Sequence, residues 1–251
     1  MAHENLQPLK NLSDNSLRQL EESLQAFGMT VLGGFHLQAD EVAQFTRLKG
    51  DVIGLMVASH GSHMWRCFQQ SAFYKDGLSD PLDRWTKRVL EELAAETGAG
   101  LALPFDRPYP PFQTWARRAT GMCHSPLGIL IHREYGLWFG LRGVFLFEVK
   151  VENQDVNKLI QSPSSVENPC DKCLEKPCLS HCPVSAFDGG GLNVEVCFSH
   201  LKNIEDRGTR PDCLSKGCFA RAACPVGIEY RYSDAQLQFH MNAYYPGNRG
   251  I

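Results

Sequence analysis

Four cysteines lie within the stretch Cys170-Asp-Lys-Cys-Leu-Glu-Lys-Pro-Cys-Leu-Ser-His-Cys-Pro183, and a proline follows the last of them. Four more come after it, and the last of these again precedes a proline: Cys197, Cys213, Cys218 and Cys224. Only Cys67 and Cys123 stand before the stretch, although the chain has 10 cysteines in all. This distribution separates a long cysteine-poor region from a short region whose structure depends on its cysteines.

Composition limits the kind of protein that carries this stretch. The chain has 251 residues, 43% of them hydrophobic, and a formal net charge of −3, which allows one large domain or a core domain with a smaller appendage. The first residues carry no basic segment followed by an apolar one, and no apolar run reaches the roughly 18 residues of a membrane helix. We therefore expect a soluble cytoplasmic protein with no membrane partner. Basic pairs such as Arg117-Arg118 are diluted by acidic residues, so nucleic acid is not an expected partner.

Cysteines in a cytoplasmic chain stay reduced, and clusters of them more often bind metal or carry out redox chemistry than form disulfides. The tail is therefore predicted to hold a metal or redox site. Outside the tail, Cys67 on a predicted helix is typical of a small buried hydrophobic residue. Cys123 beside His124 is the other position considered for a reactive thiol.

The cysteine-poor region has the periodicities of a mixed helix-and-sheet domain. Ser13 precedes a stripe of leucines at helical spacing that ends at Gly28, which predicts a helix. Ser79-Asp-Pro-Leu-Asp places a cap before a proline in a first turn and predicts another helix that ends at Gly98. The remaining predicted elements are a helix over 61–71, strands over 29–37 and 51–58, and a strand pair made by 127–132 and 137–149.

A domain boundary is predicted over residues 153–169, which are polar and punctuated by prolines. We therefore divide the chain into a mixed α/β sheet domain over 1–155, a small cysteine-rich domain over 165–235, and a C-terminal helix and tail over 236–251. Leu237 and Met241 stand at helical spacing in the last segment. The expected fold class is α+β.

The cysteine spacing resembles that of two-cluster ferredoxins, in which the run C-x2-C-x2-C-x3-C-P gives three cysteines to one 4Fe-4S cluster and the fourth to another. The spacing here, C-x2-C-x4-C-x3-C-P, is similar to a variant in the electron-transfer subunits of molybdenum oxidoreductases. The resemblance implies two 4Fe-4S clusters, one held by Cys170, Cys173, Cys178 and Cys224 and the other by Cys182, Cys197, Cys213 and Cys218. The gaps before Cys218 and Cys224 are wider than in the family, which leaves open an altered second cluster or an exchanged ligand.

Structural zinc is the alternative, since zinc also takes four thiolates. Zinc sites generally combine two tight C-x2-C pairs, and only Cys170 and Cys173 form such a pair. The compact group that ends in Cys-Pro and the second Cys-Pro downstream therefore favour iron-sulfur clusters over zinc.

Two stretches outside the tail resemble CblC-type cobalamin-processing proteins. One is Gly128-Ile-Leu-Ile-His-Arg-Glu-Tyr-Gly-Leu-Trp-Phe-Gly-Leu-Arg-Gly-Val-Phe-Leu-Phe147, and the other is Leu78-Ser-Asp-Pro-Leu-Asp83, similar to a Thr-Asp-Pro-Val-Asp segment. Epoxyqueuosine reductases, which join a nitroreductase-like cobalamin domain to two 4Fe-4S clusters, have a Tyr-Gly-Ser-Trp-Phe piece and a lone cysteine placed like Cys197. The combined resemblance covers residues 50–235 and implies a nitroreductase-like domain followed by a ferredoxin-like domain.

Departures from both families narrow the expected activity. CblC-type proteins carry an arginine, implicated in thiol handling, where this chain has Glu134, which disfavours glutathione-dependent dealkylation. The Gly-Arg-Asp-Tyr-His and Asp-Ser-Ala-Pro-Val segments of epoxyqueuosine reductases are absent, which disfavours the tRNA-modifying reaction.

The resemblance makes a corrinoid (cobalamin) the expected cofactor of the first domain, with a flavin as the alternative. The candidate binding residues are His132, Tyr135, Trp138 and Arg142. Packing is the alternative role for Tyr135 and Trp138, and an ion pair with Glu148 is the alternative for Arg142. No residue is predicted to be catalytic.

The expected function is that of an iron-sulfur redox protein which transfers electrons to the corrinoid, as a reductase or a reductive cobalamin-processing enzyme. The alternatives are a non-catalytic electron carrier that docks on a partner enzyme, and a flavin-dependent reductase. An electron donor or acceptor protein is therefore the expected protein partner.

Overall fold

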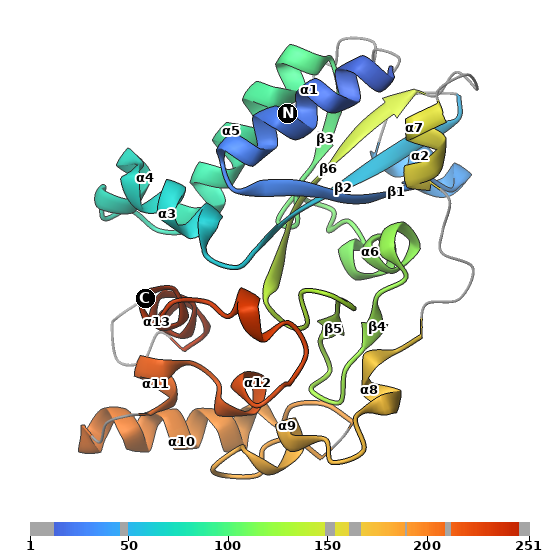
Figure 1. The fold of residues 1–251 in the computed structure, drawn as a ribbon. Helices are drawn as coiled ribbons and strands as arrows, with labels where there is room; N and C mark the ends of the chain where they lie inside the picture. The colour runs from blue at the N-terminus through green and yellow to red at the C-terminus, as the bar shows by residue number, and fades with distance from the viewer. Residues whose placement is uncertain are drawn as a thin grey trace. The chain divides into compact units, whose positions relative to one another are not determined.

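The computed structural model describes residues 13–45, 50–148, 154–160, 167–188, 190–208 and 212–245 (Figure 1). Its contacts divide the chain into two compact units. The first comprises Met1–Gly121 and Gly140–Val166, and the second comprises Met122–Phe139 and Glu167–Ile251. The segment Met122–Phe139 thus belongs with the cysteine-rich tail, whereas the division made from sequence kept it with the first domain.

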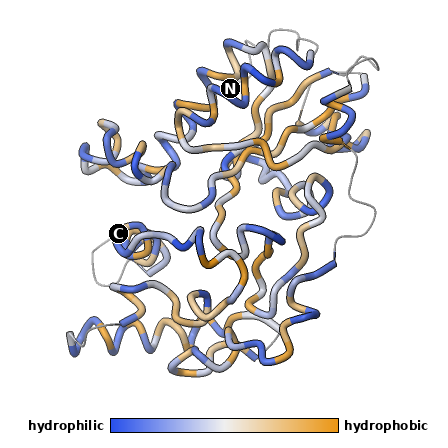
Figure 2. The backbone as a smooth tube through the Cα atoms, in the orientation of Figure 1, coloured by the Kyte–Doolittle hydropathy of each residue, from blue (hydrophilic) through white to orange (hydrophobic). Residues whose placement is uncertain are grey.

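A four-stranded sheet forms the centre of the first unit, in the order β1 (Met29–His36), β2 (Val52–His60), β6 (Phe139–Glu148), β3 (Gly100–Ala102). The β1–β2 and β3–β6 pairs are antiparallel. Every residue of β2 except the last is buried, as expected for a strand covered on both faces. Figure 2 shows the hydrophobic residues concentrated along these strands.

Helices cover the sheet on both faces. A side chain at Gly33 of β1 would collide with the Ala119 carbonyl of α6 (Phe112–Thr120), so this helix lies directly against the strand. The adjacent Gly34 faces Ile160 of α7 (Gln154–Ile160). Because successive residues of a strand point to opposite faces, α6 and α7 lie on opposite sides of the sheet. Helices α1 (Asp14–Ala26) and α5 (Pro81–Thr97) lie side by side in Figure 1.

Local signals at the ends of these helices agree with the sequence. Ser13 and Ser16 form a capping box at the start of α1. Pro81 occupies the first turn of α5, and Gly98 ends that helix in the left-handed conformation. The predicted helices over 13–28, 61–71 and 79–98 and the strands over 29–37 and 51–58 are confirmed, the third helix as α3 (His63–Gln70). Two short helices complete the unit: α2 (Ala39–Phe45) and α4 (Ala72–Lys75).

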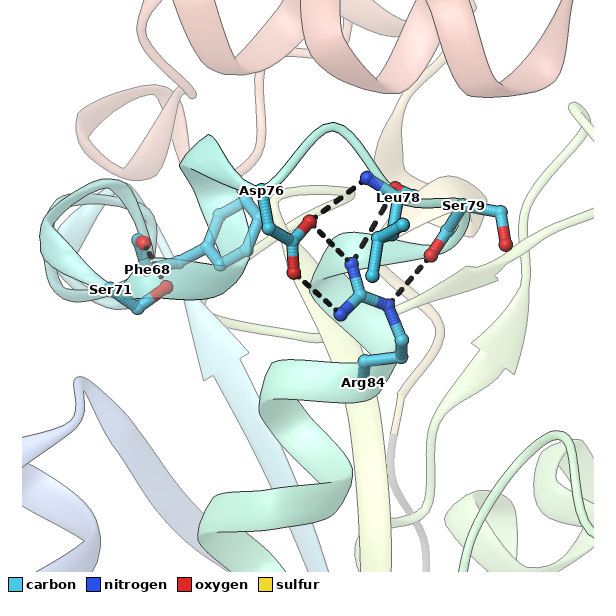
Figure 3. A network of polar contacts seen from close by, with 6 residues as sticks. All are labelled: Phe68, Ser71, Asp76, Leu78, Ser79 and Arg84. Atoms are coloured by element: carbon cyan, nitrogen blue, oxygen red, sulfur yellow. Dashed lines mark hydrogen bonds and ion pairs between the residues drawn. The ribbon is translucent and has the colours of Figure 1, made fainter.

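An ion pair fixes the loop that leads into α5 (Figure 3). Both terminal nitrogens of Arg84 donate to the Asp76 carboxylate at 2.8 Å, and its Nε donates to the Ser79 carbonyl at 2.8 Å. The pKa of Asp76 is lowered because Arg84 hydrogen-bonds to the ionised carboxylate. The Ser79-Asp-Pro-Leu-Asp segment is therefore held by the side chain of its own helix.

The second unit is built from short elements. Its strands are β4 (Cys123–His124) and β5 (Leu130–Ile131). Its helices are α8 (Pro169–Lys172), α9 (Pro177–Ser180), α10 (Val194–Arg207), α11 (Cys213–Lys216), α12 (Phe219–Ala222) and α13 (Asp234–Tyr244), with a 3-10 turn over Ile228–Tyr230. Helix α13 contains the helical spacing of Leu237 and Met241. The two units together give the expected mixture of helix and sheet, an α+β fold.

The predicted strand pair of 127–132 with 137–149 is wrong. β5 pairs with β4 in a separate two-stranded sheet, while β6 joins the four-stranded sheet. An isolated bridge from His132 to Gly136 closes a tight turn in the chain between β5 and β6. The buried run Val144–Phe147 needs partners on both edges, and β2 and β3 provide them. Within the described ranges, none of the helices has both the length and the apolar character that a membrane span requires.

Candidate functional site

Eight cysteines of the second unit surround two cavities. Four line the first, which has a volume of about 20 Å³: Cys170, Cys173, Cys178 and Cys224. Four line the second, which has a volume of about 260 Å³: Cys182, Cys197, Cys213 and Cys218. Each set is one of the two sets that the ferredoxin resemblance implies. We call them the first quartet and the second quartet.

Short helices orient the thiols of the first quartet. Cys170 lies in α8, where the side chain of Asn168 accepts a hydrogen bond from the Cys170 amide at 3.0 Å. Cys173 ends the same helix, and Cys178 lies in α9. Cys224 comes from a distant part of the chain, directly after α12. Burial, together with the nearby Cys224, Cys178 and Cys173, raises the pKa of the Cys170 thiol to about 11.

A tight approach between two backbone turns positions Cys224. Gly136 has a φ of +56°, and a Cβ there would stand 2.0 Å from the Val226 carbonyl oxygen. Gly227, with a φ of +70°, approaches the Tyr135 backbone in the same way. Glycine is required at both positions because it tolerates positive φ and has no Cβ. The turn after β5 is therefore packed against the chain that follows Cys224-Pro225.

The second quartet is drawn from a longer stretch of chain. The Ala186 amide donates to Cys182 Sγ at 3.2 Å. Cys197 lies in α10, and Cys213 is the first residue of α11, which Asp212 and Ser215 begin with a capping box. Cys218 occupies the N-cap position of α12. Burial raises the pKa of Cys213 to about 11, with further contributions from Cys218, Cys197 and Cys182.

The cysteines that raise the pKa of a thiol belong, in each case, to the same quartet as that thiol. Cys170 is affected by Cys173, Cys178 and Cys224, whereas Cys197 and Cys213 are affected by members of the second quartet. Among the described residues, no three His, Cys, Asp or Glu side chains converge closely enough to hold a single metal ion.

The other two cysteines, Cys67 and Cys123, line neither cavity. Cys67 in α3 donates to the Ala26 carbonyl at a sulfur–oxygen distance of 3.6 Å, and burial raises its pKa. It is half-buried, as is Cys123, which lies in β4 and packs against the apolar cluster that contains Cys178 and Cys224.

The four predicted cofactor-binding residues lie in different surroundings. His132 and Tyr135 stack with ring centroids 4.4 Å apart and planes at 12°. Trp138 is 1% exposed and packs against Tyr232 in an edge-on arrangement at 5.5 Å. Arg142 lies in β6 of the first unit, where its Nε donates to the Ser59 hydroxyl at 3.2 Å. The structure brings the first two together in the second unit.

Three residues near the cysteines carry contacts that the sequence analysis did not single out. The Tyr230 hydroxyl donates to Glu134 at 2.8 Å, and the Tyr230 ring meets Tyr135. Arg221 and Tyr244 line the second cavity. Tyr244 hydrogen-bonds to Cys197, and burial together with this thiol raises the pKa of Tyr244 to about 12. No motif marks these residues, because their partners are distant in sequence.

The fold has counterparts among solved structures. A Caenorhabditis elegans B12-trafficking protein, CblC, matches with a TM-score of 0.52 at 14% identity, over 90% of this chain and 91% of that one. An epoxyqueuosine reductase in complex with a tRNA-Tyr stem loop matches with a TM-score of 0.47 at 17% identity, over 86% of this chain and 66% of its own. Epoxyqueuosine reductase from Bacillus subtilis matches with a TM-score of 0.46 at 16% identity, over the same shares.

The match to CblC shows a shared fold. Its sequence identity is too low to carry over an activity or the roles of residues. No family model matches the sequence. No curated protein matches it either.

Proposed function

We propose that this chain is an iron-sulfur redox protein with two 4Fe-4S clusters, one on each cysteine quartet. The observation that carries the proposal is the separation of eight cysteines into two sets of four, each lining its own cavity. In the sequence the first quartet encloses the second, since Cys224 returns to the first quartet after all four members of the second. This is the ligand exchange expected of two-cluster ferredoxins.

The chemistry of the donors fits this group. Cysteine thiolates are the usual ligands of 4Fe-4S clusters. In a zinc site all four sulfurs stand about 2.3 Å from one ion, so they meet closely at a point. A cluster instead places each thiolate on a different iron, and the crossing of Cys182 and Cys224 between the two sets is the ligand order of two-cluster ferredoxins. Burial raises the pKa of Cys170 and Cys213, so deprotonation of the quartets is costly until a metal binds the thiolates.

When bound, the clusters would supply one-electron transfer at potentials that the surrounding protein tunes. The residues of the chain hold the cluster, restrict water around it and donate hydrogen bonds to its sulfur ligands. The Ala186 amide and the Tyr244 hydroxyl are such donors for the second quartet.

We further propose a corrinoid as the electron acceptor, with the chain acting as a reductase or a reductive cobalamin-processing enzyme. The fold shared with a B12-trafficking protein supports this choice. Stacking of His132 on Tyr135 supplies partly exposed aromatic surface of the kind that binds planar cofactors. A cofactor contact by these two residues, and one by Arg142, stay predictions. The burial of Trp138 favours packing as its role.

An external protein would supply the electrons, because two clusters store only one electron each and need repeated reduction. The proposal includes no nucleic-acid partner, since the net charge of −3 gives little attraction for phosphate. The proposed location is the cytoplasm, where thiols are kept reduced.

The test begins with protein purified without oxygen. About eight iron per chain and two reduced-state paramagnetic signals are expected for two 4Fe-4S clusters. Zinc in place of iron would overturn the proposal. The second step adds cob(II)alamin and follows its absorption spectrum during reduction.

A shift of the cob(II)alamin spectrum, together with its reduction by the loaded protein, supports the corrinoid reductase. Intact clusters with an unchanged cobalamin spectrum would instead indicate the electron carrier, and tightly bound flavin would indicate the flavin-dependent reductase. The matched control is protein in which Cys67, outside both quartets, is replaced by serine, which is expected to keep both clusters.

A further inference from the structure

Arg221 lies beside the second quartet and is held on three sides. It belongs to α12, whose N-cap residue is Cys218, and it lines the cavity of the second quartet. Its guanidinium carbon lies 4.7 Å from the ring centroid of Trp138 and 4.9 Å from that of Tyr232. Two aromatic rings therefore contact the planar cation, an arrangement that arginine favours.

Hydrogen bonds fix the orientation of the same group. Nε of Arg221 donates to the Leu137 carbonyl oxygen at 3.1 Å, and Nη2 donates to the same oxygen. Within the described residues, no carboxylate forms an ion pair with Arg221. In the described part of the chain, the partners of this charge are two neutral rings and one carbonyl oxygen, next to a cavity lined by four thiols.

A partly buried cation without an anionic partner is unfavourable in a low-dielectric environment. A 4Fe-4S cluster with four thiolate ligands carries a net negative charge, which becomes larger by one unit on reduction. A fixed cation that lines the same cavity stabilises the reduced form more than the oxidised form.

We propose that Arg221 is the counter-charge of the cluster on the second quartet and raises its reduction potential. Trp138 and Tyr232 are positioning residues that hold the guanidinium in place. This inference rests on the proposed function, because it requires a cluster on the second quartet. It makes that cluster easier to reduce than it would be without the charge.

The first quartet provides a comparison within the chain. Arg231 lies near Cys224, because its side chain bonds to the backbone carbonyl of Ala222, two residues before that cysteine. Arg231 is exposed and donates to the Ala222 carbonyl at 2.5 Å. Water screens an exposed charge much more strongly than a partly buried one. Arg231 is therefore expected to affect the first cluster less than Arg221 affects the second.

The experiment measures both reduction potentials by titration with dithionite, followed by electron paramagnetic resonance. R221M removes the charge but keeps an unbranched side chain between the two rings, and R221Q is a second charge-removing variant should R221M fail to fold. Either is expected to disfavour reduction of the second cluster about tenfold, which is about 59 mV for one electron. R221K keeps the charge and is expected to stay close to wild type. R231M is the control at the first quartet and is expected to leave the second potential unchanged.

The outcomes separate the inference from the function on which it rests. Unchanged potentials in R221M or R221Q, with both clusters present, would overturn the counter-charge role. An equal fall in R221K would also overturn it, because the hydrogen bonds to Leu137 and not the charge would then be responsible. Absence of iron in the wild-type chain would instead overturn the proposed function, before any variant is examined.

Discussion

Cys182 and Cys224 each precede a proline, yet their thiols line different cavities. Cys182 belongs to the same continuous stretch as the first quartet but lies with Cys197, Cys213 and Cys218. Cys224 stands at the far end of the tail and lies with Cys170, Cys173 and Cys178. The two residues thus cross over between the sets, and each provides a test of the assignment.

Replacement of either cysteine by serine is expected to damage one cluster selectively. Under the proposed assignment, C182S removes a ligand of the second cluster and C224S removes one of the first, so each variant should retain about half of the iron. Iron analysis and the paramagnetic spectrum of the reduced protein measure this. A loss of the same signal in both variants would contradict the assignment of Cys182 and Cys224 to separate clusters.

The hydroxyl of Tyr244 is expected to tune the second cluster. It hydrogen-bonds to Cys197, which favours the negatively charged form of that sulfur, although burial raises the pKa of the thiol overall. Hydrogen bonds to cluster sulfurs raise reduction potentials. Y244F should therefore lower the reduction potential of the second cluster, which corresponds to a several-fold smaller equilibrium constant for its reduction.

A neighbouring tyrosine provides the matched control. The rings of Tyr244 and Tyr245 lie at nearly equal distances from the Phe198 ring, 5.2 Å and 5.3 Å. Y245F removes a hydroxyl from the same aromatic cluster and is expected to leave the potential unchanged. Equal effects of the two substitutions would indicate a change in packing and not the loss of a hydrogen bond to sulfur.

Much of the fold is predictable from local patterns, whereas strand pairing is not. Caps, periodicity and glycines identify α1, α5, β1 and β2, because each signal lies within its own element. The partners of β6 lie about forty residues or more away in sequence, so its apolar run does not reveal which edges it pairs with. The sequence therefore predicts the nearer apolar run, which forms β5, as its partner, and the structure shows that this prediction is wrong.

The same distinction applies to the site. The quartets could be proposed from spacing because ferredoxin-like clusters have a known ligand order. The contacts of Arg221 with Trp138 and the Leu137 carbonyl join residues more than eighty positions apart in the sequence, and no sequence motif predicts such contacts. Residues that modify a site through such contacts become visible only in the folded chain.

Glu41 is expected to stabilise the first unit in a pH-dependent way. Its carboxylate accepts hydrogen bonds from Arg118 and, at 2.8 Å, from Trp115 Nε1. Burial raises the pKa of Glu41, but these bonds and the one from the Gln38 amide outweigh it and lower the pKa below 4.5. Since the folded-state pKa is the lower one, the stabilisation is fully present above the unfolded value and is lost as the pH falls through the folded value.

E41Q should therefore destabilise the protein by about 2 kcal/mol at neutral pH, with a difference that disappears under acidic conditions. Urea unfolding as a function of pH measures it. E21Q is the opposite control, because burial and Asp155 raise the pKa of Glu21. Its replacement should leave stability unchanged or slightly higher at neutral pH. A pH-independent loss in E41Q would show that packing and not charge is responsible.

Gly136 is expected to support the first cluster through the backbone that follows Cys224. Alanine there would place Cβ 2.0 Å from the Val226 carbonyl, so the turn and the chain after Cys224 would have to separate. G77A is the matched control, since Gly77 has a φ of +71° but open space around the Cβ position. A left-handed conformation alone costs alanine about 1 kcal/mol, whereas G136A adds a clash and should cost about 3 kcal/mol.

Thermal unfolding measures both, and iron analysis should show that G136A alone loses the first cluster while the signal of the second remains. Retention of both clusters in G136A, or an equal loss of stability in G77A, would show that the close approach of the two turns does not hold Cys224 in place.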